Sequence, residues 1–150
     1  MLLLDALLIL FPAFYITKNK KKFSAAKAFK RLGFRKMKAA KLAKETVLLL
    51  AKLLALFLLV SFLFALINFN DLDKVYNTVK GFSLPLTAYF LIVRVPAEEV
   101  FFRGFLVQKI GVVYSTALFA VAHALYGSWV EVIGAFVLGL VLARAFDRTR

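Results

Sequence analysis

The chain has 150 residues, 63% of them hydrophobic, and its 21 lysines and arginines outnumber 8 acidic residues to give a formal net charge of +13. A soluble domain of this length cannot bury so much apolar surface in one core, so the composition excludes an ordinary soluble fold and favours several membrane spans. Cysteine is absent, which excludes disulfides, thiolate nucleophiles and cysteine-ligated metals.

The first apolar run is Leu2–Ile16, which Asp5 and Pro12 interrupt. It is short for a membrane span, and it has neither the basic leader nor the cleavage site of a signal peptide. We expect a short or tilted first helix here, with a re-entrant or interfacial segment as the alternative.

Most of the positive charge lies in one loop between two apolar runs, residues 17–44. Its basic residues are Lys18, Lys20, Lys21, Lys22, Lys27, Lys30, Arg31, Arg35, Lys36, Lys38, Lys41 and Lys44. The positive-inside rule predicts that this loop is cytoplasmic and touches anionic lipid headgroups. Nucleic acid is not the expected partner, because no aromatic platform or nucleic-acid-binding fold accompanies the charge. Within the loop, Phe23–Glu45 favours a basic amphipathic helix on the inner membrane surface, or alternatively a solvated linker helix.

The rest of the chain alternates apolar segments with short polar breaks. Thr46–Phe69 is the strongest span, and the polar stretch 68–73 after it is predicted to form an outer loop. The later apolar segments are Phe82–Leu106, Val112–Tyr126 and Trp129–Phe146, separated by a basic turn at 108–111 and by Gly127-Ser128.

These segments predict an all-α polytopic membrane bundle of about five transmembrane helices, with the N-terminus outside. The basic loop, the turn near Lys109 and the basic tail are expected in the cytoplasm, and the loop near Asp71 outside. We expect one integral membrane domain with two parts. Residues 1–81 hold the N-terminal helices and the basic loop, and residues 82–150 hold a core with the chain's candidate chemistry.

That chemistry rests on charged groups inside apolar segments. Glu98, Glu99 and Arg103 lie in the segment that follows Phe82, and His123, the only histidine, lies in the next one. Charged side chains at membrane depth are costly and are usually kept where they pair or act. In a helix, Glu99 lies one turn before Arg103, and Glu98 points about 100° away from Glu99, so the two glutamates are expected to have different roles.

Further neighbours follow from the same helical spacing. Arg94 lies one turn before Glu98 and is expected to be ion-paired or to reach the interface. Pro96 cannot donate a backbone hydrogen bond, so a kink is expected just before the acidic pair. Phe119 lies one turn before His123 and is expected to pack beside the imidazole.

A glutamate base with a histidine partner can take a proton from a trapped water, which then attacks a carbonyl without a covalent intermediate. Three alternatives stay open. Glu99 and Arg103 form a structural ion pair, Glu98 serves a proton or ion pathway, or His123 makes a helix–helix hydrogen bond. One histidine cannot supply the paired histidines of a zinc protease, and no serine lies in a nucleophile-elbow sequence, so we expect no metal or cofactor.

The pattern Glu98-Glu99-x-x-x-Arg103-Gly104, followed by Phe119-x-x-x-His123, resembles the CAAX prenyl protease and bacteriocin-processing family of intramembrane glutamate proteases. The resemblance covers about Phe82 to Phe146. It implies that Glu98 activates water with help from His123, while Glu99 and Arg103 orient the site and Glu99 is a candidate to contact substrate.

The resemblance also implies a substrate class and a location. Eukaryotic members remove the last three residues of prenylated CAAX proteins, and some prokaryotic members are linked to bacteriocin maturation or self-immunity. A peptide or a prenylated protein C-terminus is therefore the expected substrate, and a prokaryotic cell membrane is the expected location.

One departure from the family pattern bears on activity. The family carries a further helix with a second histidine and an asparagine four residues on, which stabilise the oxyanion, and this chain stops at Arg150 where that helix should begin. Loss of oxyanion donors costs on the order of a hundredfold or more in rate. We therefore expect a C-terminally incomplete chain, one that a partner completes, or a non-catalytic relative such as an immunity or scaffold factor. A fragment of a proton-coupled transporter is a further alternative.

Overall fold

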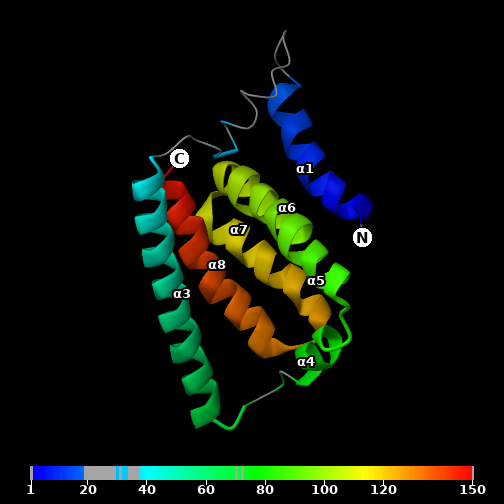
Figure 1. The fold of residues 1–150 in the computed structure, drawn as a ribbon, viewed down its shortest axis with the longest axis vertical. Coiled ribbons are helices and arrows are strands. Elements are labelled where there is room, and N and C mark those ends of the chain that lie inside the picture. Colours follow the sequence, from blue (N-terminus) through cyan, green and yellow to red (C-terminus); the bar gives the residue numbers. More distant parts are fainter. Residues whose placement is uncertain are drawn as a thin grey trace.

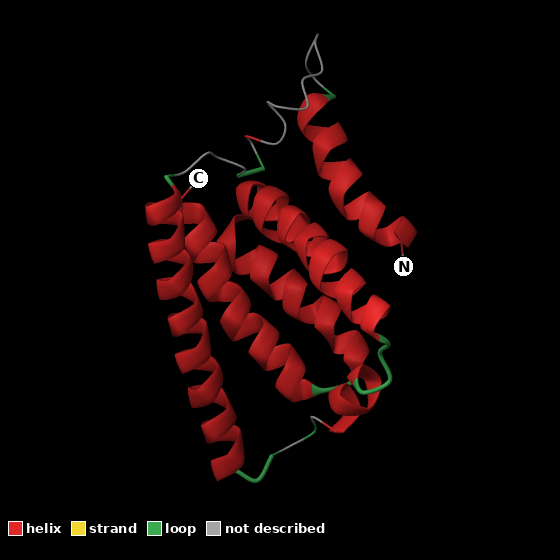
Figure 2. Cartoon of the chain, viewed as in Figure 1, coloured by secondary structure: helices red, strands yellow, loops and turns green. Residues whose placement is uncertain are grey.

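The structure, a computed structural model, describes residues 2–18, 30, 32–33, 38–69, 71 and 73–149. Across these residues every regular element is helical, which confirms the all-α fold class (Figure 2). The α-helices are α1 (Leu2–Thr17), α3 (Ala39–Leu66), α4 (Asp73–Val79), α5 (Leu84–Tyr89), α6 (Val95–Glu99), α7 (Val107–His123) and α8 (Trp129–Thr149). Two π-helical stretches, η1 (Phe90–Arg94) and η2 (Val100–Leu106), and a 3₁₀ turn, η3 (Ala124–Tyr126), complete the set.

Three described stretches are long and apolar enough to cross a membrane: Ala39–Leu66, Leu84–Tyr126 and Trp129–Thr149. The chain is therefore an integral membrane protein. The middle stretch folds back on itself at Gly111, whose φ of 83° and ψ of 171° are not helical. Glycine adopts such a positive φ without a Cβ penalty, so a single residue reverses the chain, and the helix from Leu84 continues through most of the turn predicted at 108–111.

The N-terminal elements differ in length from their predictions. The first apolar run forms α1, whose 16 residues span about 24 Å, less than the roughly 30 Å of the hydrocarbon core. Helix α3 begins at Ala39, so residues 39–45 extend the strongest span instead of belonging to a separate surface helix. The other residues of that predicted helix lie outside the described part of the chain, except Lys30, Leu32, Gly33 and Lys38.

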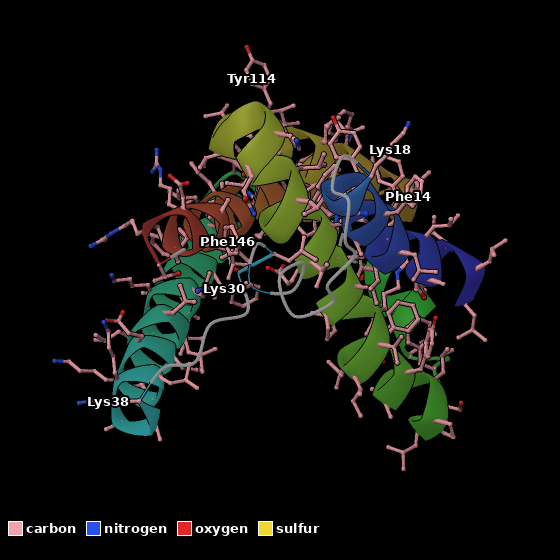
Figure 3. All side chains as sticks on the ribbon, turned by 90° about the horizontal axis from the view of Figure 1, so that it is seen from above. Phe14, Lys18, Lys30, Lys38, Tyr114 and Phe146 are labelled. Carbon is pink, nitrogen blue, oxygen red and sulfur yellow. The ribbon has the colours of Figure 1, made fainter. Side chains whose placement is uncertain are left out.

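The helices pack in an order that places α7 at the centre of the bundle (Figure 1). On one side of α7 lies α8, with α3 beyond it, and on the other side lies the helix from Leu84, with α1 against its α6 and η2 parts. Seen from above, these helices form an arch with α3 at one foot (Figure 3). No residue of α3 is buried, as expected for an apolar helix that faces lipid on most sides.

The core lies where η2, α7 and α8 meet. Its buried apolar residues include Phe102, Phe105, Val107, Ala120 and Ala143. Small buried residues, Ala120 on α7 and Gly139 and Ala143 on α8, let these two helices approach closely.

The two ends of the bundle differ in charge. The beginning of α3, the reversal at Gly111 and the end of α8 lie at one end, and α4 and the turn before α8 lie at the other (Figure 1). Lys109 Nζ lies 4.5 Å from the centre of the Tyr15 ring, which joins the end of α1 to the first of these ends. The described parts of the basic segments therefore share one end, as the predicted orientation requires. Which side of the membrane this end faces stays a prediction.

At the opposite end, Asp71 fastens the loop before α4 to the start of α8. Its carboxylate accepts hydrogen bonds from Ser128 Oγ at 2.7 Å and from the backbone N–H groups of Trp129 and Val130 at 2.6 and 3.2 Å. Desolvation raises the pKa of Asp71, but these hydrogen bonds and the charge of Lys74 outweigh it and bring the pKa below its usual value. Asp71 therefore caps a helix from a distant part of the chain.

Candidate active site

The acidic pair lies on a short α-helical turn between two π-helical stretches. Helix α6 has five residues, with η1 before it and η2 after it. The N–H of Val95 donates to the carbonyl of Phe90, so the wider π-helical pattern ends just before Pro96, which has no N–H to donate. The backbone dihedral angles stay helical at Arg94 and Val95, and the hydrogen-bond pattern changes before Pro96, while the expected kink stays a prediction. Such π-helical turns are frequent at functional sites.

Glu99 pairs with Arg103, as the spacing predicted. Arg103 Nη1 lies 3.3 Å from Glu99 Oε1, and the Arg103 side chain is 4% exposed. Its guanidinium carbon lies 3.8 Å from the centre of the Phe119 ring on α7, a cation–π contact. None of its nitrogens makes a hydrogen bond to a described residue. Arg103 therefore depends on one carboxylate and one aromatic face.

Gly139 lets α8 approach this arginine. A Cβ at position 139 would lie 3.2 Å from Arg103 Nη2, 3.2 Å from the Phe119 ring and 3.3 Å from the Thr116 methyl group. Each of these distances is shorter than nine in ten Cβ contacts in proteins. The absence of a side chain at Gly139 thus allows α8 to close over the contact between Arg103 and Phe119.

Glu98 belongs to a second ion-pair chain, which reaches α1. Glu98 Oε1 lies 2.9 Å from Arg94 Nε, and Arg94 Nη1 lies 2.9 Å from Asp5 Oδ1. The hydroxyl of Tyr89 donates to the other oxygen of Asp5. The Arg94–Glu98 pair was predicted from the helical spacing. Asp5 was not predicted as its partner, although an acid in the middle of an apolar run is itself a signal.

His123 is held by the backbone of its own helix. Its Nδ1 lies 2.8 Å from the Phe119 carbonyl oxygen. A carbonyl only accepts, so Nδ1 carries a proton, and in the neutral form of the ring the lone pair is on Nε2. The imidazole lies between the Phe119 ring at 4.3 Å and the Tyr126 ring at 5.8 Å, centre to centre. The predicted packing of Phe119 beside the imidazole is confirmed.

The register of the two antiparallel helices brings the acidic pair and the histidine to similar depth. Arg103 stacks on Phe119, Glu99 lies one turn before Arg103, and His123 lies one turn after Phe119. Because the helices run in opposite directions, one turn from this contact leads the same way along both. Glu99 and His123 therefore lie at about the same level, with Glu98 one residue further along.

Tyr126 lies beside the histidine. Its ring centre is 5.8 Å from that of the His123 imidazole. No hydrogen bond joins Glu98 to His123 within the described part of the chain. Sequence reasoning missed Tyr126, because a tyrosine at the end of an apolar helix carries no distinctive signal. Among the described residues, no three potential ligands gather as a metal site would require.

Residues 80–150 match the family model described as Rce1-like, type II CAAX prenyl endopeptidase Rce1-like. The matched segment holds Glu98, Glu99, Arg103 and His123 and confirms the resemblance drawn from the two motifs. It covers slightly less than half of the chain and leaves out α1 and α3. No curated protein and no solved structure matches the chain.

Proposed function

From the likeness of residues 80–150 to type II CAAX prenyl endopeptidases, we propose that this membrane protein is an intramembrane endopeptidase in which Glu98 activates water. The family match supports the protease class. The observation that supports the choice of residues is the contact between Arg103 and Phe119, because the two antiparallel helices then bring the acidic pair and His123 to similar depth. A base and a second proton acceptor at one level of neighbouring helices suit the activation of one water.

The free atoms of both groups fit this chemistry. Of the two Glu98 oxygens, only Oε1 has a donor among the described residues, so Oε2 is available to accept from water. His123 Nε2 is available because Nδ1 is the protonated nitrogen. A water between the two groups donates one hydrogen to each, and its oxygen lone pair is then free to attack.

In the proposed reaction, the water oxygen bonds to the peptide carbonyl carbon while Glu98 takes one water proton. The carbonyl π electrons move to oxygen and form a tetrahedral intermediate. When the C–N bond breaks, Glu98 returns the proton to the leaving nitrogen, which gives one carboxylic acid and one amine. His123 orients the water, and no bond between enzyme and substrate forms.

Glu99 and Arg103 have a supporting role in this proposal. The stacked and ion-paired Arg103 fixes the turn that carries both glutamates. The Glu99 side chain is 38% exposed against 18% for Glu98, so Glu99 is the better placed of the two to contact a bound peptide. A peptide or a prenylated protein C-terminus is the proposed substrate, because the matched family is described as a prenyl endopeptidase.

We also propose that the basic end of the bundle faces the cytoplasm and binds anionic headgroups. The support is the charge of the described residues at that end, which include Lys38, Lys41, Lys44, Lys109, Arg144 and Arg148. Anionic lipids of the cytoplasmic leaflet attract such clusters by about 1 kcal/mol for each basic residue near the surface.

The test is cleavage of a prenylated peptide by the purified chain in lipid vesicles. Replacement of Glu98 by glutamine keeps the shape but removes the base, so the rate is expected to fall about 10²- to 10⁴-fold. His123→Gln is expected to lower the rate less, and Lys52→Gln on α3, away from the site, is the control for a lost charge. Cleavage by Glu98→Gln at the rate of the unsubstituted chain would refute the proposal. Absence of cleavage by the unsubstituted chain, with or without the prenyl group, would favour a non-catalytic relative.

A further inference from the structure

Beyond the residues of the two family motifs, the ion-pair chain that reaches α1 has a role to be explained. We infer that Asp5 and Arg94 are positioning residues that hold the Glu98 carboxylate in the orientation its reaction needs, which makes α1 part of the active site. The inference rests on the proposed function of Glu98. Asp5 lies outside the matched segment, and neither residue belongs to the motifs that carry the resemblance.

The geometry fixes each contact in this row of ion pairs. The Arg94 guanidinium is planar, and it uses two different edges, Nη1 toward Asp5 and Nε toward Glu98, each at 2.9 Å. A planar fork held at two edges cannot rotate without losing one of the pairs. The Tyr89 hydroxyl in turn holds Asp5. Among the described residues, only one oxygen of Glu98 has a hydrogen-bond donor, so the orientation of the carboxylate is set while its other oxygen can accept from water.

The linked ion pairs of Asp5, Arg94 and Glu98 are more buried than a surface ion pair. The Asp5 side chain is 1% exposed, and those of Arg94 and Glu98 are 19% and 18% exposed. Exposed ion pairs contribute little, whereas removal of one partner of a buried pair leaves an uncompensated charge. Loss of Arg94 would leave two carboxylates without their shared cation, while loss of Asp5 would leave Arg94 and Glu98 still paired.

Docking of α1 does not depend on Asp5 alone. The rings of Phe11 and Tyr15 pack against the Phe105 ring at 5.7 and 5.3 Å between centres, and Lys109 lies over Tyr15. These contacts lie at the other end of α1 from Asp5. A variant at Asp5 can therefore disturb Glu98 while α1 keeps its place, which separates a positioning role from an anchoring one.

Kinetics of peptide cleavage test the inference. Arg94→Gln is expected to lower kcat about 10- to 100-fold, the cost of a small misplacement of a catalytic group, with KM within about twofold of the unsubstituted value. Arg94→Lys should recover part of kcat, and Asp5→Asn should lower it less than Arg94→Gln. The double variant, Asp5→Asn with Arg94→Gln, should be no slower than Arg94→Gln alone, because both residues act on Glu98 through the same row of ion pairs.

The position of α1 against the bundle is measured in each of these variants. The chain has no cysteine, so a cysteine pair at Tyr15 and Lys109, which leaves the contact between Phe11 and Phe105 in place, reports the position of α1 by cross-linking. Equal cross-linking with reduced kcat supports positioning of Glu98. A loss of kcat that is always matched by a loss of cross-linking would overturn the inference in favour of an anchor.

Two comparisons separate this inference from the proposed function. If Glu98→Gln stays active, the proposed function fails. If Glu98→Gln is inactive while Arg94→Gln and Asp5→Asn keep full kcat, only the positioning role fails. Lys52→Gln again serves as the charge control.

A second measurement needs no activity. Dicyclohexylcarbodiimide adds to a protonated carboxyl group and leaves an N-acylurea, and a carboxylate held by a guanidinium resists it. We expect labelling of Glu98, measured by mass spectrometry of its peptide, to rise severalfold in Arg94→Gln and to return to the original level in Arg94→Lys.

Other charged or titratable groups near Glu98 are Glu99 and Arg103 on its own helix, Tyr126 on η3 and, through Tyr126, Glu131 on α8, with His123 beside Tyr126. They are unchanged in these variants. Equal labelling of Glu98 with and without Arg94 would overturn the inference.

Discussion

Replacement of Asp71 by alanine should loosen the end of the bundle opposite the basic segments. The Asp71 carboxylate accepts two backbone N–H groups from the first turn of α8 and the hydroxyl of Ser128. Ser128 Oγ accepts in turn from the Glu131 N–H at 3.1 Å. Alanine would leave the first turn of α8 with Ser128 as its only cap.

The cost follows from these bonds. Loss of a helix cap costs about 0.5–2 kcal/mol, and the hydrogen bond to the Ser128 hydroxyl adds roughly 0.5–1.5 kcal/mol. Water replaces part of the lost hydrogen bonding, because Asp71 is only half-buried. We therefore expect Asp71→Ala to lower the free energy of unfolding by about 1–3 kcal/mol, measured by denaturation with sodium dodecyl sulfate in mixed micelles.

Asp73 supplies the matched control. It lies two residues further on, in the first turn of α4, and makes no hydrogen bond or ion pair with another described side chain. Asp73→Ala removes a carboxylate two residues away from Asp71 and should change the free energy of unfolding by less than about 0.5 kcal/mol. Equal effects of the two substitutions would refute the assignment of Asp71 as a cap.

The pH dependence gives the same prediction a second readout. The pKa of Asp71 is below its ordinary value of 3.8, so its contribution to stability is complete above that value and is lost as pH falls through the lower folded value. The advantage of the unsubstituted chain over Asp71→Asn should therefore shrink as pH is lowered below about 4. If the difference in unfolding free energy between the unsubstituted chain and Asp71→Asn instead increased at low pH, the lowered pKa of Asp71 would be contradicted.

Further predictions concern packing and orientation. Gly104→Ala would place a Cβ 2.8 Å from the Leu32 carbonyl oxygen and should destabilise the chain by about 1–3 kcal/mol, whereas Gly134→Ala meets nothing within 4 Å and should be neutral or stabilising. Equal unfolding free energies for the two variants would contradict this packing. With Lys38→Cys and Asn77→Cys in right-side-out vesicles, an impermeant maleimide should label only position 77, and labelling of both or of position 38 alone would contradict the orientation.

The parts of the site that sequence alone could predict are the contacts within one helix. Arg94 with Glu98, Glu99 with Arg103 and Phe119 with His123 are each four residues apart, and that spacing stacks side chains on one helical face. These pairs depend only on the segments being helical, which the apolar runs indicated. All three were found as expected.

The contacts that sequence reasoning missed are those between helices. The pairing of Asp5 with Arg94 joins residues 89 positions apart, and that of Asp71 with Ser128 joins residues 57 apart. Helical periodicity gives the face of a residue but not the height at which two helices cross, so it cannot choose such partners.

Element boundaries were missed where the chain departs from a simple apolar pattern. Helix α4 (Asp73–Val79) follows the predicted loop at 68–73, in residues to which no element was assigned, and α3 begins in residues assigned to a surface helix. The reversal after Ile110 needs only Gly111, because a positive φ turns the chain in one residue. Each of these boundaries depends on capping, packing or a single dihedral angle, which cannot be derived from the apolar pattern of the sequence.

The central claim is that the side chains of Glu98 and His123 face one shared water, and cross-linking tests it most directly. In this cysteine-free chain, cysteines at positions 98 and 123 should be joined by a short thiol-reactive linker. Cysteines at positions 100 and 123 should not, because Val100 is near the same depth but points about 200° away from Glu98. The account predicts linkage of the first pair alone. Linkage of the second pair, or of neither, would contradict it.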